Sequence, residues 1–123
     1  MVATFAKTMG LLLIAFGALA LMPGFVSQGL LFGTFRVDLL HNVINLMSGV
    51  LLAAVGFSDN VDASRRVTLM VAGLYAIFSV VGFIAADGVV LGMPMNMADN
   101  VLNLTITVLA MIAALPQRYE KAI

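Results

Sequence analysis

The fold of this chain is decided by a stretch that occurs twice, first as DLLHNVINL at residues 38–46 and again as NMADNVLNL at residues 96–104. At one constant spacing the two copies share two Asn residues, one Val and one Leu. A long apolar run follows each copy. A polar motif that twice opens an apolar run predicts a duplicated structural unit.

The composition predicts an integral membrane protein that has the lipid bilayer as its surroundings. Of the 123 residues, 63% are hydrophobic and 10% are charged, whereas soluble proteins have roughly 45–50% apolar and about 25% charged residues. The length fits one transmembrane domain, residues 1–123. Six basic residues balance six acidic ones, so no basic surface points to nucleic acid as a partner.

Four apolar segments have about the length of a membrane crossing, which takes about 20 helical residues. The clearest is VTLMVAGLYAIFSVVGFIAA, which contains no charged residue. We expect the spans between Lys7 and Pro23, over residues 39–58, over residues 67–86, and from residue 100 to about residue 115, where Pro116 ends the last one. The predicted fold class is therefore all-α, a four-helix transmembrane bundle.

The first apolar segment has an alternative interpretation. Lys7, a short apolar stretch and Ala18-Leu19-Ala20 resemble the three regions of a cleaved signal peptide. The duplication favours a retained membrane helix, because the first repeat needs this helix to match the second.

A further pair of matching segments lies upstream of the Asn motifs, GLLFG at residues 29–33 and GVVLG at residues 88–92. These two segments lie 59 residues apart, whereas the two Asn motifs lie 58 residues apart, so the loops of the two repeats differ in length by one residue. We expect two tandem helical hairpins, with repeat 1 over about residues 1–58 and repeat 2 over about residues 59–123. Because each repeat crosses the membrane twice, both copies have the same orientation.

The charges predict how the bundle is oriented. An even number of spans places both termini and the middle loop on one side, and that side carries Lys7, Arg65, Arg66, Arg118 and Lys121. The other side has Arg36 as its one basic residue. Lys and Arg are retained on the cytoplasmic side, so we expect cytoplasmic termini and Asn motifs near the outer face.

Both motifs form a polar stripe, because helix positions i, i+3, i+4 and i+7 share one face. The first stripe consists of Asp38, His41, Asn42 and Asn45, and the second of Asn96, Asp99, Asn100, Asn103 and Thr107. An unsatisfied polar group in hydrocarbon costs several kcal/mol, so both stripes should point into the bundle. We expect His41 near Asp99 and Asn45 near Asn103.

The stripes have two interpretations. In the structural one, amide side chains hydrogen-bond between helices, and Asp38 and Asn96 cap the second and fourth helices. In the functional one, ionisable groups inside a membrane mark a route for protons or a small polar solute, with His41 as the group that changes charge near neutral pH and Asp99 as its partner.

Cofactor and catalytic interpretations have little support in the residues. Asp38, His41 and Asp99 provide three ligands for zinc only if the fold brings them together, and a haem would need one of nine unspecific Met residues as second ligand. We expect no metal and no cofactor. The chain has no Cys, and none of its Ser residues has a nucleophile-elbow context, so we expect no enzyme activity.

The motifs GTFRVDLLHNVINLMSG and GMPMNMADNVLNL resemble those of a small bacterial four-helix integral-membrane family of unknown function, over nearly the whole chain. Its members have a Gly in the outer loop and then Asn and His-Asn residues that enter the second and fourth helices. Many relatives have His where this chain has Asn45 and Asn103, and Asn where it has Asp38. The resemblance implies a four-helix transmembrane fold and a bacterial cytoplasmic membrane as the location. It implies no activity.

Two functions follow as expectations. The first is a non-enzymatic accessory or scaffold subunit with a structural polar cluster, which contacts another membrane protein or a second copy of itself. The alternative is a minimal conduit or carrier for protons or a small polar solute, which uses His41 and Asp99.

Overall fold

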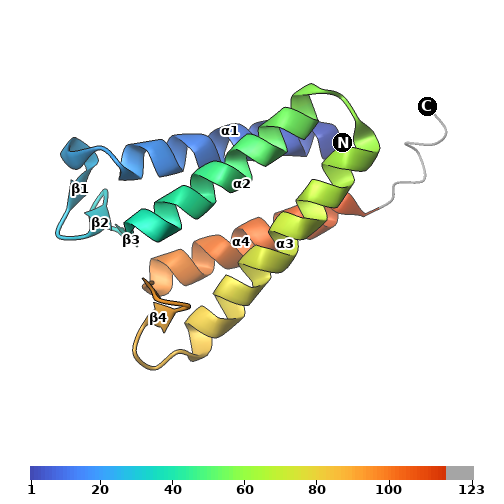
Figure 1. Ribbon diagram of the computed structural model, residues 1–123. Coiled ribbons are helices and arrows are strands. Elements are labelled where there is room, and N and C mark those ends of the chain that lie inside the picture. Colours follow the sequence, from blue (N-terminus) through green and yellow to red (C-terminus); the bar gives the residue numbers. More distant parts are fainter. Residues whose placement is uncertain (116–123) are drawn as a thin grey trace.

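The computed structural model describes residues 1–115 and confirms the predicted fold class, because four antiparallel helices form the molecule (Figure 1). Each helix is long and apolar enough to cross a membrane. The helices are α1 (Val2–Ala20), α2 (Leu39–Phe57), α3 (Val61–Ile84) and α4 (Met97–Ala114).

Two helices begin earlier than the hydrophobic runs predicted, because polar residues cap them. Asn60 precedes α3, and its side chain accepts a hydrogen bond from the backbone N–H of Ala63 at 3.0 Å. The polar middle loop therefore supplies the first turns of α3, which begins at Val61 rather than at residue 67. In the same way α4 begins at Met97, ahead of residue 100.

The helices pair as two hairpins, α1 with α2 and α3 with α4. Both hairpin loops lie at one end of the molecule, and the N-terminus and the α2–α3 turn lie at the other (Figure 1). At that second end Lys7 forms a 3.0 Å ion pair with Asp59, and the Arg65 side chain donates a 2.9 Å hydrogen bond to the carbonyl of Ala114. The predictions for Pro116, Arg118 and Lys121 concern positions outside the described residues.

Short strands occupy the hairpin loops. The first loop contains η1 (Pro23–Phe25), β1 (Val26–Ser27), β2 (Leu30–Leu31) and β3 (Phe35–Arg36), and the second contains β4 (Val89–Val90) and β5 (Met93–Pro94). All the strands are antiparallel to their neighbours. Strands of two residues are too short to give an alternating pattern, so the sequence did not reveal them.

The two loops have matching geometry. Gly29 and Gly88 both have positive φ, and their carbonyls accept hydrogen bonds from the backbone N–H of Val37 at 3.0 Å and of Met95 at 2.8 Å. Leu31 pairs with Phe35 in the first loop, and Val90 with Met93 in the second. The turn between the paired residues is thus one residue longer in the first loop than in the second. This residue explains why the Gly segments of the two repeats lie one residue further apart in the sequence than the Asn motifs do.

The first hairpin is packed through glycine at its helix crossing. A Cβ atom placed on Gly49 would lie 2.7 Å from the carbonyl oxygen of Gly10, and one placed on Gly10 would lie 2.5 Å from the backbone N of Ala53. Such distances are too short for a side-chain carbon, so only glycine allows the two backbones to approach this closely. Close approach through small residues is common between membrane helices.

The interior contains one apolar layer that all four helices share. Leu13, Leu52, Val71 and Ile106 each come from a different helix, and with Ala6 and Tyr75 they form one buried cluster. Two smaller clusters lie beneath the loops: Leu31 and Val37 pack with Ala20, and Val90, Met93 and Met95 pack with Phe78. The apolar loop residues therefore fold over the end of the bundle.

The close contact in the first hairpin gives a stability prediction. Gly49→Ala should lower the free energy of unfolding by about 1–3 kcal/mol, the usual cost of overpacking, because the new methyl group meets the Gly10 carbonyl. The measurement is a chemical unfolding curve of the purified protein in detergent micelles. The matched control is Gly73→Ala, since a Cβ atom there has nothing within 4 Å; equal losses in both variants would contradict the packing.

Candidate functional site

Seven of the nine predicted polar residues are buried inside the bundle, each with at most 6% of its surface exposed. They are His41, Asn42, Asn45, Asp99, Asn100, Asn103 and Thr107. The other two, Asp38 and Asn96, are half-buried at the starts of α2 and α4. We call these nine residues the polar cluster.

The predicted helix caps are confirmed. The Asp38 carboxylate accepts a hydrogen bond from the backbone N–H of His41 at 2.9 Å. At the start of α4 the Asn96 side chain accepts from the backbone N–H of Asp99, and the Asp99 carboxylate accepts from the backbone N–H of Asn96, both at 3.0 Å. This reciprocal pair is a capping box, so one oxygen of Asp99 has a structural role.

A hydrogen bond between the two hairpins lies deeper in the bundle. The Tyr75 hydroxyl, from α3, donates to the side-chain oxygen of Asn45, from α2, at 2.7 Å. Both residues are buried. Tyr75 is not among the polar residues predicted from the sequence. Its hydroxyl group in the middle of an uncharged span was a usable signal, because the hydroxyl of a buried Tyr usually has a hydrogen-bond partner.

Other amides of the cluster bind backbone carbonyls. The Asn42 side chain donates to the carbonyl of Ala20 at 3.3 Å and so fixes the end of α1 against α2. The Asn96 side chain donates to the carbonyl of Thr34 at 2.8 Å and so joins α4 to the loop of the other hairpin. The Asn100 side chain packs directly against the backbone of Gly82 in α3.

His41 and Asp99 have a common neighbour. The backbone of Arg36, in β3, lies beside both side chains, so β3 reaches the place where α2 and α4 begin. Among residues 1–115 no hydrogen bond joins His41 directly to Asp99. The expected proximity of His41 and Asp99 therefore stays a prediction.

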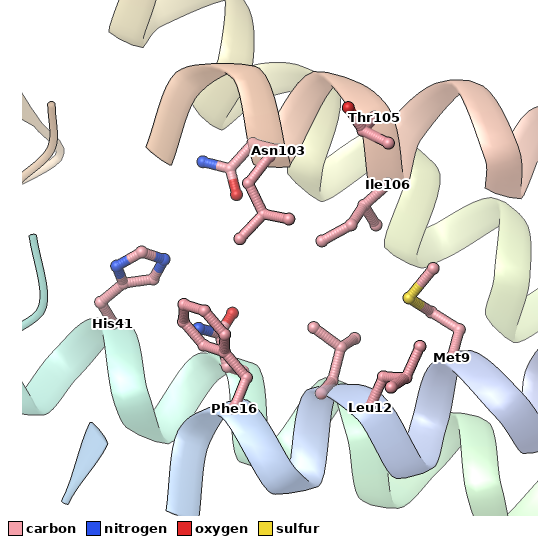
Figure 2. A pocket seen from close by; sticks show the side chains of 10 residues that line it. Met9, Leu12, Phe16, His41, Asn103, Thr105 and Ile106 are labelled. Atoms are coloured by element: carbon pink, nitrogen blue, oxygen red, sulfur yellow. The ribbon is translucent and has the colours of Figure 1, made fainter. Parts of the chain in front are cut away.

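Asn45 and Asn103 do share a space, as expected. They line, together with His41, a cavity of about 150 Å³ (Figure 2). Its remaining walls are Met9, Leu12, Leu13 and Phe16 of α1 and Leu102, Thr105 and Ile106 of α4. In Figure 2 the His41 ring and the Asn103 amide lie at one end of this space, and Met9 and Leu12 lie at the other.

Several buried polar atoms have no partner within residues 1–115. They are Nδ1 of His41, Oγ1 of Thr68, and one side-chain oxygen each of Asn42, Asp99 and Asn100. A buried polar atom without a partner costs about 1–3 kcal/mol, and native proteins have few of them. The polar cluster therefore has hydrogen-bonding capacity that the described chain does not use.

The cluster has limited means for chemistry. No group of three His, Asp or Glu side chains within residues 1–115 is placed to hold a metal ion. The shared apolar layer of Leu13, Leu52, Val71 and Ile106 lies on the far side of Asn45 and Asn103, towards the end with the N-terminus. What the site can do is hydrogen-bond a neutral group at the edge of an apolar cavity.

The hydrogen bond between the hairpins gives a second stability prediction. Asn45→Leu and Tyr75→Phe should each destabilise the protein, because each leaves a buried partner unsatisfied. Together they should show a coupling energy of about 1 kcal/mol, typical of interhelical hydrogen bonds in membranes. Unfolding curves of the two single variants and the double variant provide the value.

The control for this cycle is Thr105→Val paired with Tyr75→Phe. The Thr105 hydroxyl is exposed and donates to the carbonyl of Val101 in its own helix, so its effect should simply add to that of Tyr75→Phe. Strict additivity of Asn45→Leu and Tyr75→Phe would contradict the assigned contact.

Comparisons with known proteins give one match. Neither curated proteins nor solved structures include a match to this chain. The model of a family described as a domain of unknown function (DUF4383) matches residues 3–115, which run from the first turn of α1 to just beyond the end of α4. The four apolar helices and both Asn motifs lie within the match, and the chain therefore belongs to this family of unknown function, DUF4383.

Proposed function

We propose that the protein is a non-enzymatic accessory or scaffold subunit of the membrane, and that its polar cluster has an architectural role. The observation that carries this proposal is the buried 2.7 Å hydrogen bond from Tyr75 to Asn45, which ties the two hairpins together. The bond from Asn96 to Thr34 does the same at the loop end. A protein of this kind works by presenting a defined shape inside the bilayer.

The outer surface supports an action within the membrane. Large apolar side chains are exposed on every helix, among them Leu12 at 59%, Met47 at 61%, Met70 at 68% and Met111 at 53%. Such a surface is stable against lipid tails or against another membrane protein. Most of the exposed large apolar side chains belong to the four helices, so most of the apolar area available to a partner lies in the bilayer.

Three buried hydroxyl groups support the non-enzymatic part of the proposal. The Ser64 and Thr107 hydroxyls donate to backbone carbonyls, at 3.1 Å and 2.9 Å, and the Tyr75 hydroxyl donates to Asn45. An activated nucleophile needs a hydrogen-bonded base beside it. Within residues 1–115 these hydroxyls have structural partners instead.

We also propose that the two hairpins are copies of one ancestral unit. The matching Asn motifs support this, as do the capped starts of α2 and α4 and the similar bonds at Gly29 and Gly88. In each hairpin a β-turn precedes the second helix. The units diverge most in α1 and α3, which differ in length.

We propose a bacterial cytoplasmic membrane as the location, with cytoplasmic termini. Lys7, Arg65 and Arg66 lie at the end of the molecule that carries the N-terminus, and Arg36 lies at the loop end. The excess of positive charge at the first end supports its placement on the cytoplasmic side.

The orientation has a direct test, because the chain contains no Cys. In intact cells an impermeant thiol reagent should label Ser27→Cys, in the exposed loop strand β1, and should leave Asp62→Cys unlabelled until the membrane is permeabilised. Asp62 is preferable to its neighbour Asn60, which caps α3. If the reagent labelled Asp62→Cys and not Ser27→Cys in intact cells, the termini would lie outside the cytoplasm and the proposed orientation would be wrong.

The alternative function, a conduit or carrier for protons or a small polar solute, rests on His41 and Asp99 at the loop end. A conduit needs polar groups or space along its whole length. The apolar layer of Leu13, Leu52, Val71 and Ile106 contributes no polar side chain to such a route within the described residues, which gives the accessory role more support than the conduit.

Purification from the native membrane tests the accessory role. The tagged protein, extracted in a mild detergent, should bring a second membrane protein with it in a fixed ratio, which is measured by mass spectrometry of the intact complex. A tagged, unrelated four-helix membrane protein extracted in the same way controls for adventitious association. Recovery of the chain alone, with proton or solute flux in liposomes that His41→Asn abolishes, would favour the conduit instead.

A further inference from the structure

The cavity in Figure 2 has the chemical form of a site for an amphiphile. His41, Asn45 and Asn103 contribute its polar groups, and His41 and Asn103 lie at one end, whereas Met9 and Leu12 of α1 lie at the other (Figure 2). No Asp, Glu, Lys or Arg lines the space. Its volume of about 150 Å³ is that of about five water molecules in the liquid, which suits a small head group.

An apolar groove continues the cavity along the bundle. A second hollow of about 450 Å³ shares Met9 and Leu12 with the first and is lined further along by Phe5, Leu109 and Ile112. It lies between α1 and α4, which belong to different hairpins and pack mainly on other helices. The groove therefore opens sideways, towards the space that lipid tails occupy around a membrane helix.

The polar end contains hydrogen-bonding capacity that is not used. The His41 ring is 2% exposed, and in Figure 2 one of its two ring nitrogens faces the space. The Asn103 amide donates to the thioether of Met95 at 3.6 Å, and a thioether is a weak acceptor. A ligand oxygen at this place would accept a hydrogen bond from the nitrogen of His41 that faces the space and would be a better acceptor for Asn103 than the thioether.

We propose that the cavity and the groove together bind one amphiphile with an uncharged hydroxyl or carbonyl head group and a hydrocarbon tail. The head group hydrogen-bonds to His41 and Asn103, and the tail lies between α1 and α4. A charged head group is excluded because its desolvation would have no opposite charge to offset it.

The test uses photoactivatable dodecanol, with a diazirine in its chain, in liposomes of phosphatidylcholine that contain the purified protein. Label should concentrate on the α1 and α4 residues that line the groove, as located by mass spectrometry of peptides. Unlabelled dodecane should compete about tenfold less well than unlabelled dodecanol, the ratio that one hydrogen bond provides. Equal competition, or label spread evenly over the exposed faces of all four helices, would overturn the proposal.

Two variants provide the matched control for the groove. Leu11 and Leu12 are adjacent and similarly exposed, at 52% and 59%, but Leu12 lines both hollows and Leu11 lines neither. Leu12→Trp should therefore reduce labelling severalfold, and Leu11→Trp should not. Equal labelling of the two variants would overturn the placement of the tail.

A third variant tests the head group. His41→Leu should keep the labelling of the groove and lose the preference for dodecanol over dodecane, since the tail contacts are unchanged. A preference that persists would overturn the role of His41. In native membranes, cross-linking from a photoreactive amino acid at position 12 to a protein instead of a lipid would assign the groove to a partner and overturn the proposal.

Discussion

Hydrocarbon offers no hydrogen bonds, and the requirement to satisfy polar groups inside the protein determines how this chain folds. Most of the polar side chains within the spans turn towards the other helices, and seven cluster residues are buried. The bond from Tyr75 to Asn45 is the clearest result, because it connects hairpins that otherwise pack mainly within themselves. The apolar faces are left for lipid.

The same requirement explains the loops. Each hairpin loop must return the chain to the start of the next helix and satisfy its first N–H groups, which Asp38 and Asn96 do with their side chains. The small strands place Leu31 and Val90 beneath the loop, where both are fully buried. The loops therefore close the end of the bundle that contains the polar cluster, and the cavity opens between α1 and α4 instead.

Sequence patterns predicted the features that depend on local chemistry. Apolar runs between charged residues indicated four helices, and the spacing of the Asn motifs indicated which faces turn inward, as the burial of Asn42 and Asn100 confirms. Features that depend on which residues meet in space were not predictable. The partner of Asn45 is 30 residues away, and the cavity at His41 is lined by side chains of α1, α2 and α4, which come from both hairpins. Strands of two residues are likewise set by turn geometry rather than by a periodic pattern.

The central claim is that a buried polar contact joins the two hairpins in the membrane. Solid-state NMR of the isotope-labelled protein in lipid bilayers measures this contact directly. We expect a through-space cross-peak between the ring carbons of Tyr75 and the side-chain amide of Asn45, because the Tyr75 hydroxyl oxygen lies 2.7 Å from the Asn45 amide oxygen. A spectrum in which both residues are assigned and Asn45 has cross-peaks only to its own hairpin would contradict it.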